Sequence, residues 1–271
     1  MSVDLHIHTT ASDGTWTAQE LIDNALRAGL DTLAITDHDS VDNVLEGQRL
    51  AAVAGLKFLT GVELNSTKAG LNIHVLGYGI DIGNAALKEL MAHNIALMLD
   101  VDIESVDLLE KLGWPVSVAE FKRYTYDRRR GGWASLAYLE DKGLCTGVND
   151  FFQRIFTKEH ALGFPEFPSI AEVIQVIHEA GGLAICAHAA SGFHGPGLEK
   201  ILALLEKEAF DGYECYHSNH EEVDVQHLRQ LCQSKNLYIT GGSDCHGAFV
   251  PGRFLGVPKI EREQLYLPLL D

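Results

Sequence analysis

Histidine and carboxylate residues recur where short apolar runs of this 271-residue chain end. His6 and His8 follow the first run, and Asp244 and His246 follow the last. Residues two apart in extended backbone point to the same side, so each pair directs two side chains at one site. The full set of candidate ligands contains six histidines, two aspartates and one glutamate: His6, His8, Asp13, His38, Glu63, His74, His188, Asp244 and His246.

This donor set contains no thiolate, which suits borderline and hard divalent ions such as Mn²⁺, Fe²⁺ or Zn²⁺. One tetrahedral ion needs about four ligands, so the set predicts two or three divalent metal ions. A carboxylate such as Glu63 is the natural bridge between them. Multinuclear sites of this kind activate water and clamp the attacking and leaving oxygens of a phosphoryl group. The residue types therefore predict metal-dependent hydrolysis of a phosphate ester.

A single histidine near a strand end is most often structural or exposed, but two spaced pairs and further ligands at matching strand ends favour a metal site. We expect Asp13 and His38 to take part in catalysis as well as in metal binding. His217 and His220 follow another apolar run, and either one, or a metal-bound water, could protonate the leaving alcohol. The other histidines are expected on helix surfaces or in loops: His93, His160, His178, His194 and His227.

The elements that must position these residues alternate along the chain. Apolar runs predict strands over residues 3–7, 33–36, 58–64, 73–78, 183–187, 212–216 and 237–241, with a short closing strand near 254–257. Amphipathic stretches predict helices over residues 17–28, 41–54, 169–180, 198–209 and 221–234. Thr17 and Glu20 form a capping-box pattern, and Gly29 ends the first helix. This order predicts parallel strands joined by crossover helices, and about seven such strands fit a barrel.

The alternation stops after Asp81. Four helical stretches follow without an intervening strand, at residues 85–111, 118–124, 134–142 and 148–156. We interpret residues 83–162 as an inserted helical subdomain, and residues 1–82 and 163–271 as the barrel.

The net charge is −17, from 21 basic and 38 acidic residues. This balance argues against binding of long nucleic acid or an anionic membrane. The sequence contains neither a signal-like start nor an apolar run long enough to span a bilayer, and its five cysteines are scattered, so we expect a cytoplasmic protein. Its oligomeric state is open. Arg128, Arg130 and Arg253 are the candidates for contact with a substrate phosphate, because arginine binds phosphate bidentately.

The motifs resemble those of the PHP (polymerase and histidinol phosphatase) superfamily. The resemblance rests on Asp4-Leu5-His6-Ile7-His8, Ser12-Asp13-Gly14, Thr36-Asp37-His38, Gly61-Val62-Glu63, His74, His188 and Gly242-Ser243-Asp244-Cys245-His246-Gly247. It implies an α/β fold, a distorted (β/α)₇ barrel with a trinuclear metal centre. It also implies three ligand sets: His6, His8, Glu63 and Asp244; Glu63, His74 and His188; and Asp13, His38 and His246.

The chain length and helical insertion are similar to the stand-alone branch of metal-dependent phosphoesterases. That branch includes nucleoside 3′,5′-bisphosphate phosphatases and an enzyme that trims short RNA from the 5′ end. The chain departs from the branch at Gly131-Gly132, where the branch has Pro-His, and at Ala189, where it has Pro. These departures concern substrate recognition more than metal binding.

We therefore expect a phosphoesterase that acts on a small phosphorylated metabolite, most plausibly a nucleotide, by attack of a metal-bound hydroxide. The nucleotide would be a nucleoside 3′,5′-bisphosphate or a short 5′-phosphorylated oligonucleotide. The alternatives are a histidinol-phosphate phosphatase, hydrolysis of a non-phosphate substrate, and a non-catalytic metal-binding PHP module.

Overall fold

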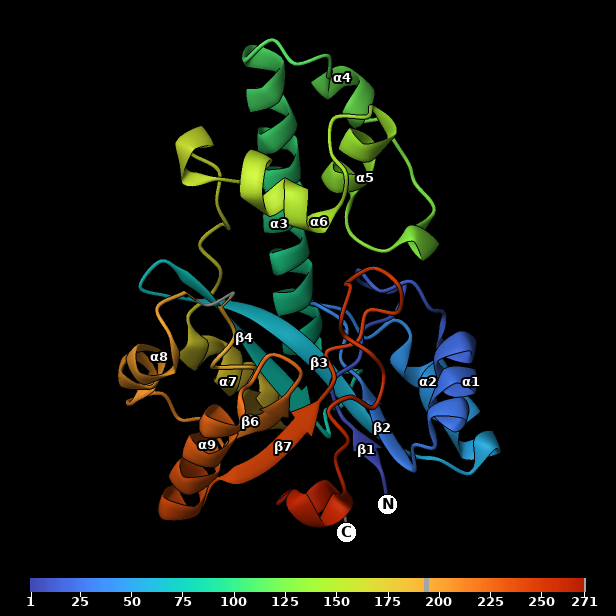
Figure 1. Cartoon of the computed structure of the whole chain (residues 1–271), viewed down its shortest axis with the longest axis vertical. Helices are drawn as coiled ribbons and strands as arrows, with labels where there is room; N and C mark the ends of the chain where they lie inside the picture. Colours follow the sequence, from blue (N-terminus) through green and yellow to red (C-terminus); the bar gives the residue numbers. More distant parts are fainter. Residues whose placement is uncertain (193–194, 271) are drawn as a thin grey trace.

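A computed structural model describes residues 1–192 and 195–270 and contains one seven-stranded sheet (Figure 1). The strands lie beside one another in chain order. They are β1 (Val3–Asp4), β2 (Thr32–Ile35), β3 (Lys57–Lys68), β4 (Leu71–Tyr78), β5 (Leu183–Cys186), β6 (Gly212–His217) and β7 (Tyr238–Gly242). All seven predicted internal strands are present.

Backbone hydrogen bonds join the two edges of the sheet. The amide of Leu5 donates to Gly241 at 3.2 Å, that of Asp244 to His6 at 2.8 Å, and that of His8 to Cys245 at 2.9 Å. These bonds continue the β1 and β7 directions beyond the strand ends. The sheet is thereby nearly closed into a barrel, as the sequence predicts, and the closing seam carries the two spaced ligand pairs.

The prediction of uniformly parallel strands is wrong for β4, which is antiparallel to both β3 and β5. Only Ala69 and Gly70 separate β3 from β4, with φ angles of 51° and 75°. Two residues with positive φ make a hairpin, whereas a parallel connection needs a crossover of a dozen or more residues. As a result, the amino-terminal half of β4 lies beside the carboxyl-terminal half of β3, with His74 opposite Asn65.

Five helices surround the sheet: α1 (Ala18–Ala28), α2 (Val44–Ala54), α7 (Ile170–Glu179), α8 (Leu198–Leu205) and α9 (Glu222–Lys235) (Figure 1). The predicted capping box of Thr17 and Glu20 is present, and Gly29 ends α1 in the left-handed conformation. Each helix buries one apolar stripe; in α1 it includes Leu21 and Ile22. Burying one such side chain stabilises the fold by about 1.5–3 kcal/mol, so these stripes fix the helices against the barrel.

The longest helix, α3 (Ala85–Lys111), extends from the barrel to a second group of helices (Figure 1). That group contains α4 (Val118–Phe121), α5 (Ala134–Asp141) and α6 (Val148–Asp150), followed by a π-helical turn at Phe151–Ile155. Leu87 and Leu90 of α3 pack in the barrel core, whereas Val106 and Leu109 pack in a separate apolar cluster with these helices. Among residues 1–192 and 195–270, no helix has the length and apolarity needed to cross a membrane.

The predicted closing strand near 254–257 is wrong, because these residues form turns. No described residue pairs with residues 254–257 in a strand or bridge, and the side chains of Phe254 and Val257 are exposed. Isolated bridges from Ser2 to Glu261 and from Ile239 to Tyr266 fasten the following segment to the barrel instead.

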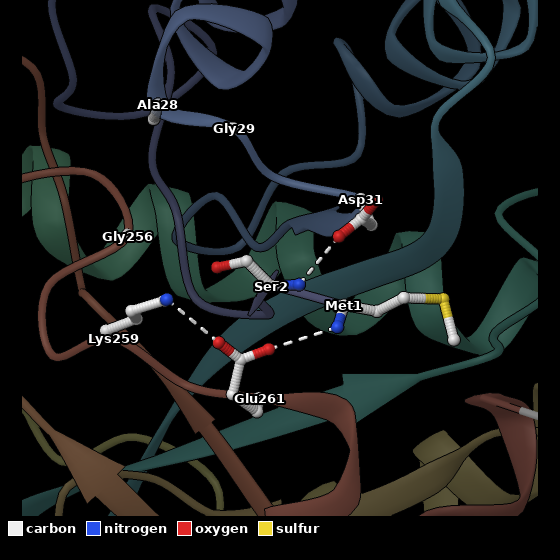
Figure 2. A pocket seen from close by; sticks show the side chains of 8 residues that line it. All are labelled: Met1, Ser2, Ala28, Gly29, Asp31, Gly256, Lys259 and Glu261. Atoms are coloured by element: carbon white, nitrogen blue, oxygen red, sulfur yellow. Dashed lines mark hydrogen bonds and ion pairs between the residues drawn. The ribbon is translucent and has the colours of Figure 1, made fainter.

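A small surface pocket of 380 Å³ lies where this segment meets the start of β1 (Figure 2). The Met1 amino group lies 3.0 Å from Glu261 Oε2, and Lys259 Nζ lies 3.0 Å from Glu261 Oε1. The amide of Ser2 donates to Asp31 at 2.7 Å. The pocket is at the amino end of β1, away from His6 and His8, and in barrels that end contributes to stability rather than to chemistry.

Candidate metal centre

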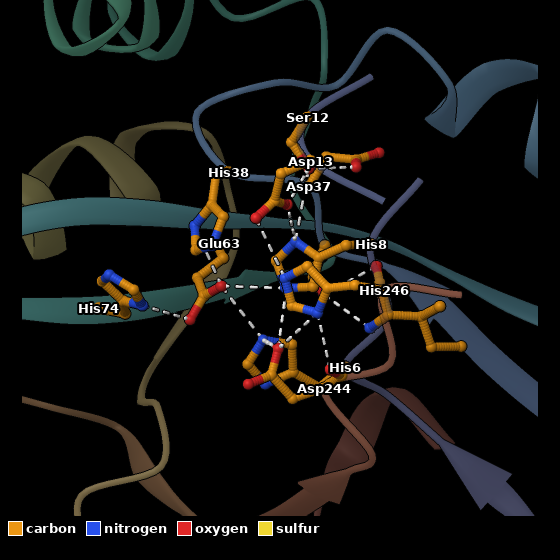
Figure 3. A network of polar contacts seen from close by, with 12 residues as sticks. His6, His8, Ser12, Asp13, Asp37, His38, Glu63, His74, Asp244 and His246 are labelled. Carbon is orange, nitrogen blue, oxygen red and sulfur yellow. Dashed lines mark hydrogen bonds and ion pairs between the residues drawn. The ribbon is translucent and has the colours of Figure 1, made fainter. Parts of the chain in front are cut away.

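Glu63 lies at the centre of the predicted ligands (Figure 3). Its side chain is fully buried, and both carboxylate oxygens face imidazole nitrogens. Oε2 lies 3.2 Å from three of them: His6 Nε2, His8 Nε2 and His38 Nδ1. Oε1 lies 3.0 Å from His74 Nδ1 and 2.9 Å from His188 Nε2. One carboxylate thus connects five imidazoles from four separate segments, the position expected of a bridging ligand.

Asp244 completes a first group of four on the closing seam. Its Oδ1 lies 3.4 Å from His6 Nε2 and 3.2 Å from His8 Nε2. The ligand atoms of His6, His8, Glu63 and Asp244 all lie within 4.8 Å of one another. This group matches the first ligand set that the motifs imply.

Asp13 forms a second group with three histidines on the other side of His8 (Figure 3). Its Oδ2 lies 3.3 Å from His246 Nε2, and its Oδ1 lies 3.6 Å from His8 Nδ1. His38 is the fourth member. His38 also groups with Glu63 and His74, so it lies between two candidate sites. His188 reaches these groups through Glu63. The structure therefore brings all nine predicted ligands together.

Four buried atoms at the centre have no hydrogen bond: His6 Nε2, His8 Nε2, His38 Nδ1 and Glu63 Oε2. Buried polar atoms are nearly always hydrogen-bonded, and leaving one unpaired costs about 1–3 kcal/mol. Each of the three nitrogens lies 3.2 Å from Glu63 Oε2, and divalent cations take imidazole and carboxylate donors together. The donor set thus fits divalent metal ions.

Two hydrogen bonds fix the imidazoles from behind. Glu214 Oε1 lies 2.9 Å from His6 Nδ1, and the backbone carbonyl of Asp244 lies 2.8 Å from His246 Nδ1. Since each acceptor requires a proton on Nδ1, Nε2 of each ring is left as the acceptor atom facing the centre. Such partners orient metal-binding histidines and select their tautomer.

Sequence reasoning missed Glu214 and two other buried carboxylates. Besides His6, Glu214 accepts from the amide of His188 at 2.8 Å. Asp37 accepts from Thr9 and Ser12, and Asp4 accepts from the amides of Ser243 and Gly256. Each holds a loop that carries ligands. The available signal was an acidic residue inside an otherwise apolar run, as at Glu214 in β6.

The backbone at two ligands is unusual. His188 and Asp244 have φ angles of 25° and 54°, in or near the left-handed region that non-glycine residues rarely adopt. Such conformations cost about 1–3 kcal/mol each and persist at functional sites where surrounding contacts impose them. Here hydrogen bonds supply those contacts: the backbone amide of His188 donates to the side chain of Glu214, and that of Asp244 donates to the carbonyl of His6.

The buried charges shift the acidities of the ligands. Burial alone would raise the pKa of Glu63 and Asp244, but the surrounding histidines hold both well below the usual range. Burial lowers the pKa of His38 to about 3, although the negative charge of Glu63 acts to raise it. For His8, burial is outweighed by the carboxylates of Asp244 and Glu63, which raise its pKa to about 10. The carboxylates are thus ionised and able to act as ligands at neutral pH.

His217 and His220 lie behind the centre, and neither lines the adjoining cavity. The amide of Asn219 donates to His217 Nδ1 at 3.0 Å, so Nε2 carries the proton toward Asp244 Oδ2 at 3.2 Å. His220 Nδ1 donates to the carbonyl of Cys215, and its Nε2 accepts from the amide of Ala190. Burial and His217 lower the pKa of His220. Both rings are therefore committed to protein partners.

The predicted arginines are placed differently from one another. Arg128 and Arg253 line the cavity beside the metal ligands. Arg253 forms an ion pair with Asp244, and Arg128 donates to the carbonyl of Ala11 at 3.3 Å. Arg130 does not line the cavity: its guanidinium pairs with Glu140 and Asp141 on α5.

The other described histidines do not join the site. His93 and His178 are exposed, His178 and His227 pair with Asp211 and Glu199, and His160 contacts the carbonyl of Ile155. His194 lies outside the described residues.

The cavity beside the metal ligands has a volume of 580 Å³ and two unlike walls. One wall consists of the candidate ligands Asp13, His38, Glu63, His74, His188, Asp244 and His246. The opposite wall comes mainly from α3 and the helices beyond it, with Phe249 from the loop after β7. A molecule held there would contact polar ligands on one side and apolar side chains on the other.

Comparisons with known proteins agree with this geometry. The PHP domain family matches residues 4–108. A 5′-3′ exoribonuclease from Haemophilus influenzae is 29% identical, over 90% of this chain and 89% of its own length. A phosphoribosyl 1,2-cyclic phosphate 1,2-diphosphodiesterase from Eggerthella lenta is 26% identical, over 92% of this chain and 95% of its own. A 3′,5′-nucleoside bisphosphate phosphatase from Chromobacterium violaceum is 26% identical, over 94% and 90% respectively.

A solved structure from Bifidobacterium adolescentis, described as a candidate metal-dependent phosphoesterase, superposes with a TM-score of 0.83. It is 26% identical in sequence, and the superposition covers 96% of this chain and 93% of that one. The similarity thus includes the helices beyond α3 as well as the barrel.

Proposed function

Because the chain belongs to the PHP family, we propose that it is a metal-dependent phosphoesterase that hydrolyses a phosphate ester of a nucleotide. The observation that carries this proposal is the convergence of five imidazoles on the buried carboxylate of Glu63. The family relation adds the reaction class, since the named relatives all act on phosphate esters.

We assign three sites to the nine ligands. His6, His8, Glu63 and Asp244 would hold one ion; Glu63, His74 and His188 would hold a second; and Asp13, His38 and His246 would hold a third. Divalent ions supply water activation and neutralise the charge that develops on a phosphoryl group. The donor types admit Mn²⁺, Fe²⁺ and Zn²⁺, and Glu63 would be shared by the first two sites.

The chain's own residues bind and orient the substrate. Arg128 is the cavity-lining guanidinium that has no carboxylate partner among its hydrogen bonds, so we assign it to a phosphoryl oxygen. Arg253 restrains Asp244 and screens its charge from an incoming phosphate. His217 donates to Oδ2 of Asp244, the oxygen that Arg253 also contacts, which makes it a positioning residue rather than a proton donor to the leaving alcohol.

The substrate is a nucleoside 3′,5′-bisphosphate or a short 5′-phosphorylated oligonucleotide held at one end. The bisphosphate phosphatase and exoribonuclease relatives support this choice. The net charge led us to expect no binding of long nucleic acid. The relatives do not support that expectation, because two of them are exoribonucleases. We place the enzyme in the cytoplasm, where its five buried, unpaired cysteines would stay reduced.

The test is product release by Mn²⁺-loaded protein: inorganic phosphate from adenosine 3′,5′-bisphosphate, AMP and histidinol phosphate, mononucleotides from a 5′-phosphorylated tetranucleotide RNA, and the ring-opened product from phosphoribosyl 1,2-cyclic phosphate. Glu63→Gln should abolish release, whereas Glu89→Gln, an exposed change on α3, should leave it intact. Release from the nucleotides alone supports the proposal. Release from histidinol phosphate alone would reassign the substrate, and silence on all substrates with metal bound would make the chain a non-catalytic metal-binding module.

A further inference from the structure

Aromatic side chains gather on the cavity wall that faces the metal ligands. We call this wall the aromatic chamber and define it by Trp133, Phe152, Phe156, Phe164 and Phe249, all of which are half-buried. Ile95, Met98 and Leu99 of α3 line the same cavity. Half-buried rings pack against one another and still present part of their surface to the open volume that they border.

The rings form a continuous path that starts at the metal centre. Phe249 lies 6.4 Å from the ring of His246, a candidate ligand, and 6.0 Å from Trp133. Trp133 lies 5.7 Å from Phe152, and Phe152 lies 6.2 Å from Phe164. Each separation is a ring-contact distance. A group attached to a phosphate at the metal ligands would therefore extend along aromatic surface.

Positive charge is scarce in this cavity. Arg128 and Arg253 are the only lysine or arginine side chains among the described residues that line it, and Asp244 neutralises Arg253. Arg129 and Arg130, next to Arg128 in sequence, pair with Glu20, Glu140 and Asp141 instead. The chamber therefore suits an uncharged planar group better than a second phosphate.

Three polar side chains that line the cavity beside the chamber are already bonded within the protein. Asp102 accepts from Ser135 at 2.6 Å, Ser105 donates to the carbonyl of Val101 at 2.7 Å, and Tyr126 donates to the carbonyl of Gly132 at 2.8 Å. Reading the identity of a base requires donors and acceptors aimed at its edge, whereas stacking accepts any base. The wall offers mainly stacking.

We propose that the aromatic chamber binds the base of the nucleotide by stacking, and that it selects for a planar base without distinguishing one base from another. This inference rests on the proposed function, because the phosphate at the metal ligands anchors the other end of the substrate. It names the class of substrate as nucleoside phosphates of any base, and Trp133 as the main residue for selection against phosphate esters that lack a base.

The first test compares AMP, GMP, CMP and UMP with ribose 5-phosphate, which has the same phosphate and sugar but no base. Each is assayed as a substrate or as a competitive inhibitor, so the result does not depend on which ester is cleaved. Stacking of one base predicts that the four nucleotides bind roughly 10- to 100-fold more tightly than ribose 5-phosphate and differ among themselves by less than about tenfold. Equal binding of AMP and ribose 5-phosphate, or a preference above 100-fold for one base, would overturn it.

The second test uses two matched tryptophan variants. Trp133→Leu should weaken AMP binding about 5- to 30-fold and leave ribose 5-phosphate binding within twofold. Trp114→Leu changes a tryptophan of the same apolar cluster that does not line the cavity, and it should change neither. Equal weakening of both ligands by Trp133→Leu would mean a structural role and contradict the proposal.

A binding readout separates this inference from the catalytic one. Titration of AMP into the Zn²⁺-loaded protein should quench Trp133 fluorescence, and the quenching should be lost in Trp133→Leu but kept in Trp114→Leu. Quenching without any phosphate release on metal loading would refute the proposed function but retain the chamber. Phosphate release without quenching, and with equal use of ribose 5-phosphate, would do the reverse.

Discussion

Glu214 lies 2.9 Å from Nδ1 of His6, on the opposite side of the imidazole from Glu63, which lies 3.2 Å from Nε2. The second oxygen of Glu214 accepts from the amide of His188 at 2.8 Å. One buried carboxylate in β6 therefore orients two candidate ligands that follow two other strands, β1 and β5. A carboxylate in this position also makes the imidazole a more basic donor.

Glu214→Gln should lower Mn²⁺ affinity about 10- to 100-fold, the usual effect of losing such a partner. Glutamine keeps the side-chain volume, but it has a single acceptor oxygen for two N–H groups. Isothermal titration of the metal-free protein with Mn²⁺ measures the change, and circular dichroism checks the fold. Unchanged affinity would show that Glu214 does not position His6.

Removing different carboxylates should remove different numbers of ions. Asp13 belongs to one ligand group, whereas Glu63 faces three histidines with one oxygen and two with the other. Asp13→Asn should lose one metal ion per chain, and Glu63→Gln should lose more than one. Elemental analysis after gel filtration gives the ratios. Equal losses in the two variants would contradict the bridging role.

Asp102→Asn should stabilise the protein at neutral pH. Burial raises the pKa of Asp102 to about 6 from 3.8, against the hydrogen bonds from Ser135, so the fold favours the protonated form. That stability is full below about pH 4 and is lost as pH rises through 6. Asparagine stays neutral, so its advantage in unfolding free energy should grow from near zero at pH 4 to as much as ~3 kcal/mol at pH 7. Urea unfolding at both pH values measures it.

The exposed Asp100→Asn on the same helix is the control and should show no such growth. A pH-independent difference between Asp102→Asn and the natural chain would mean that Asp102 does not change its protonation between these pH values.

Gly132→Ala should disturb the contact between the insertion and the loop that carries Asp13. Gly132 has a φ of 72°, its amide donates to the carbonyl of Asp13 at 2.8 Å, and an added Cβ would lie 2.9 Å from the ring of Phe249. Gly143 has a similar φ of 68°, but an added Cβ there meets no atom within 4 Å. Gly143→Ala therefore measures the backbone cost alone.

We expect Gly143→Ala to cost about 1–2 kcal/mol of unfolding free energy and Gly132→Ala about 1–3 kcal/mol more, because overpacking adds to backbone strain. Gly132→Ala should also raise the substrate KM, since Phe249 lines the cavity. Guanidinium unfolding and steady-state kinetics test both points. Equal stability and equal KM in the two variants would show that the close approach of Gly132 to Phe249 affects neither folding nor substrate binding.

Much of the site could be predicted because its ligands leave strand ends with a fixed side-chain period. His6 and His8 point together for that reason, and the motif pattern supplied the ligand groups. The antiparallel direction of β4 was also available in the two-residue spacing at Ala69-Gly70, but the alternation of strands and helices favoured a parallel strand. Short connections limit topology more strictly than element order does.

Other features depended on tertiary contacts that no local pattern contains. Arg128 and Arg130 are two residues apart in one 3₁₀ turn, yet one lines the cavity and the other pairs with α5. His217 and His220 follow a strand end, as the ligands do, but backbone groups of Asn219, Cys215 and Ala190 and the side chain of Asp244 occupy their nitrogens. Glu214 has no spacing partner, because its contacts come from two other strands.

The antiparallel β4 strand also gives the site an order of assembly. Glu63 and His74 are 11 residues apart on one hairpin, whereas His6 and Asp244 come from the first and last strands. Closing a short loop costs less chain entropy than closing one that spans nearly the whole chain, so the hairpin half of the centre can form before the barrel shuts. A cation bound by both His6 and Asp244 would then hold the first and last strands of the barrel together. Removal of this cation would speed amide hydrogen exchange along β1 and β7, while the amides of the β3–β4 hairpin would stay protected.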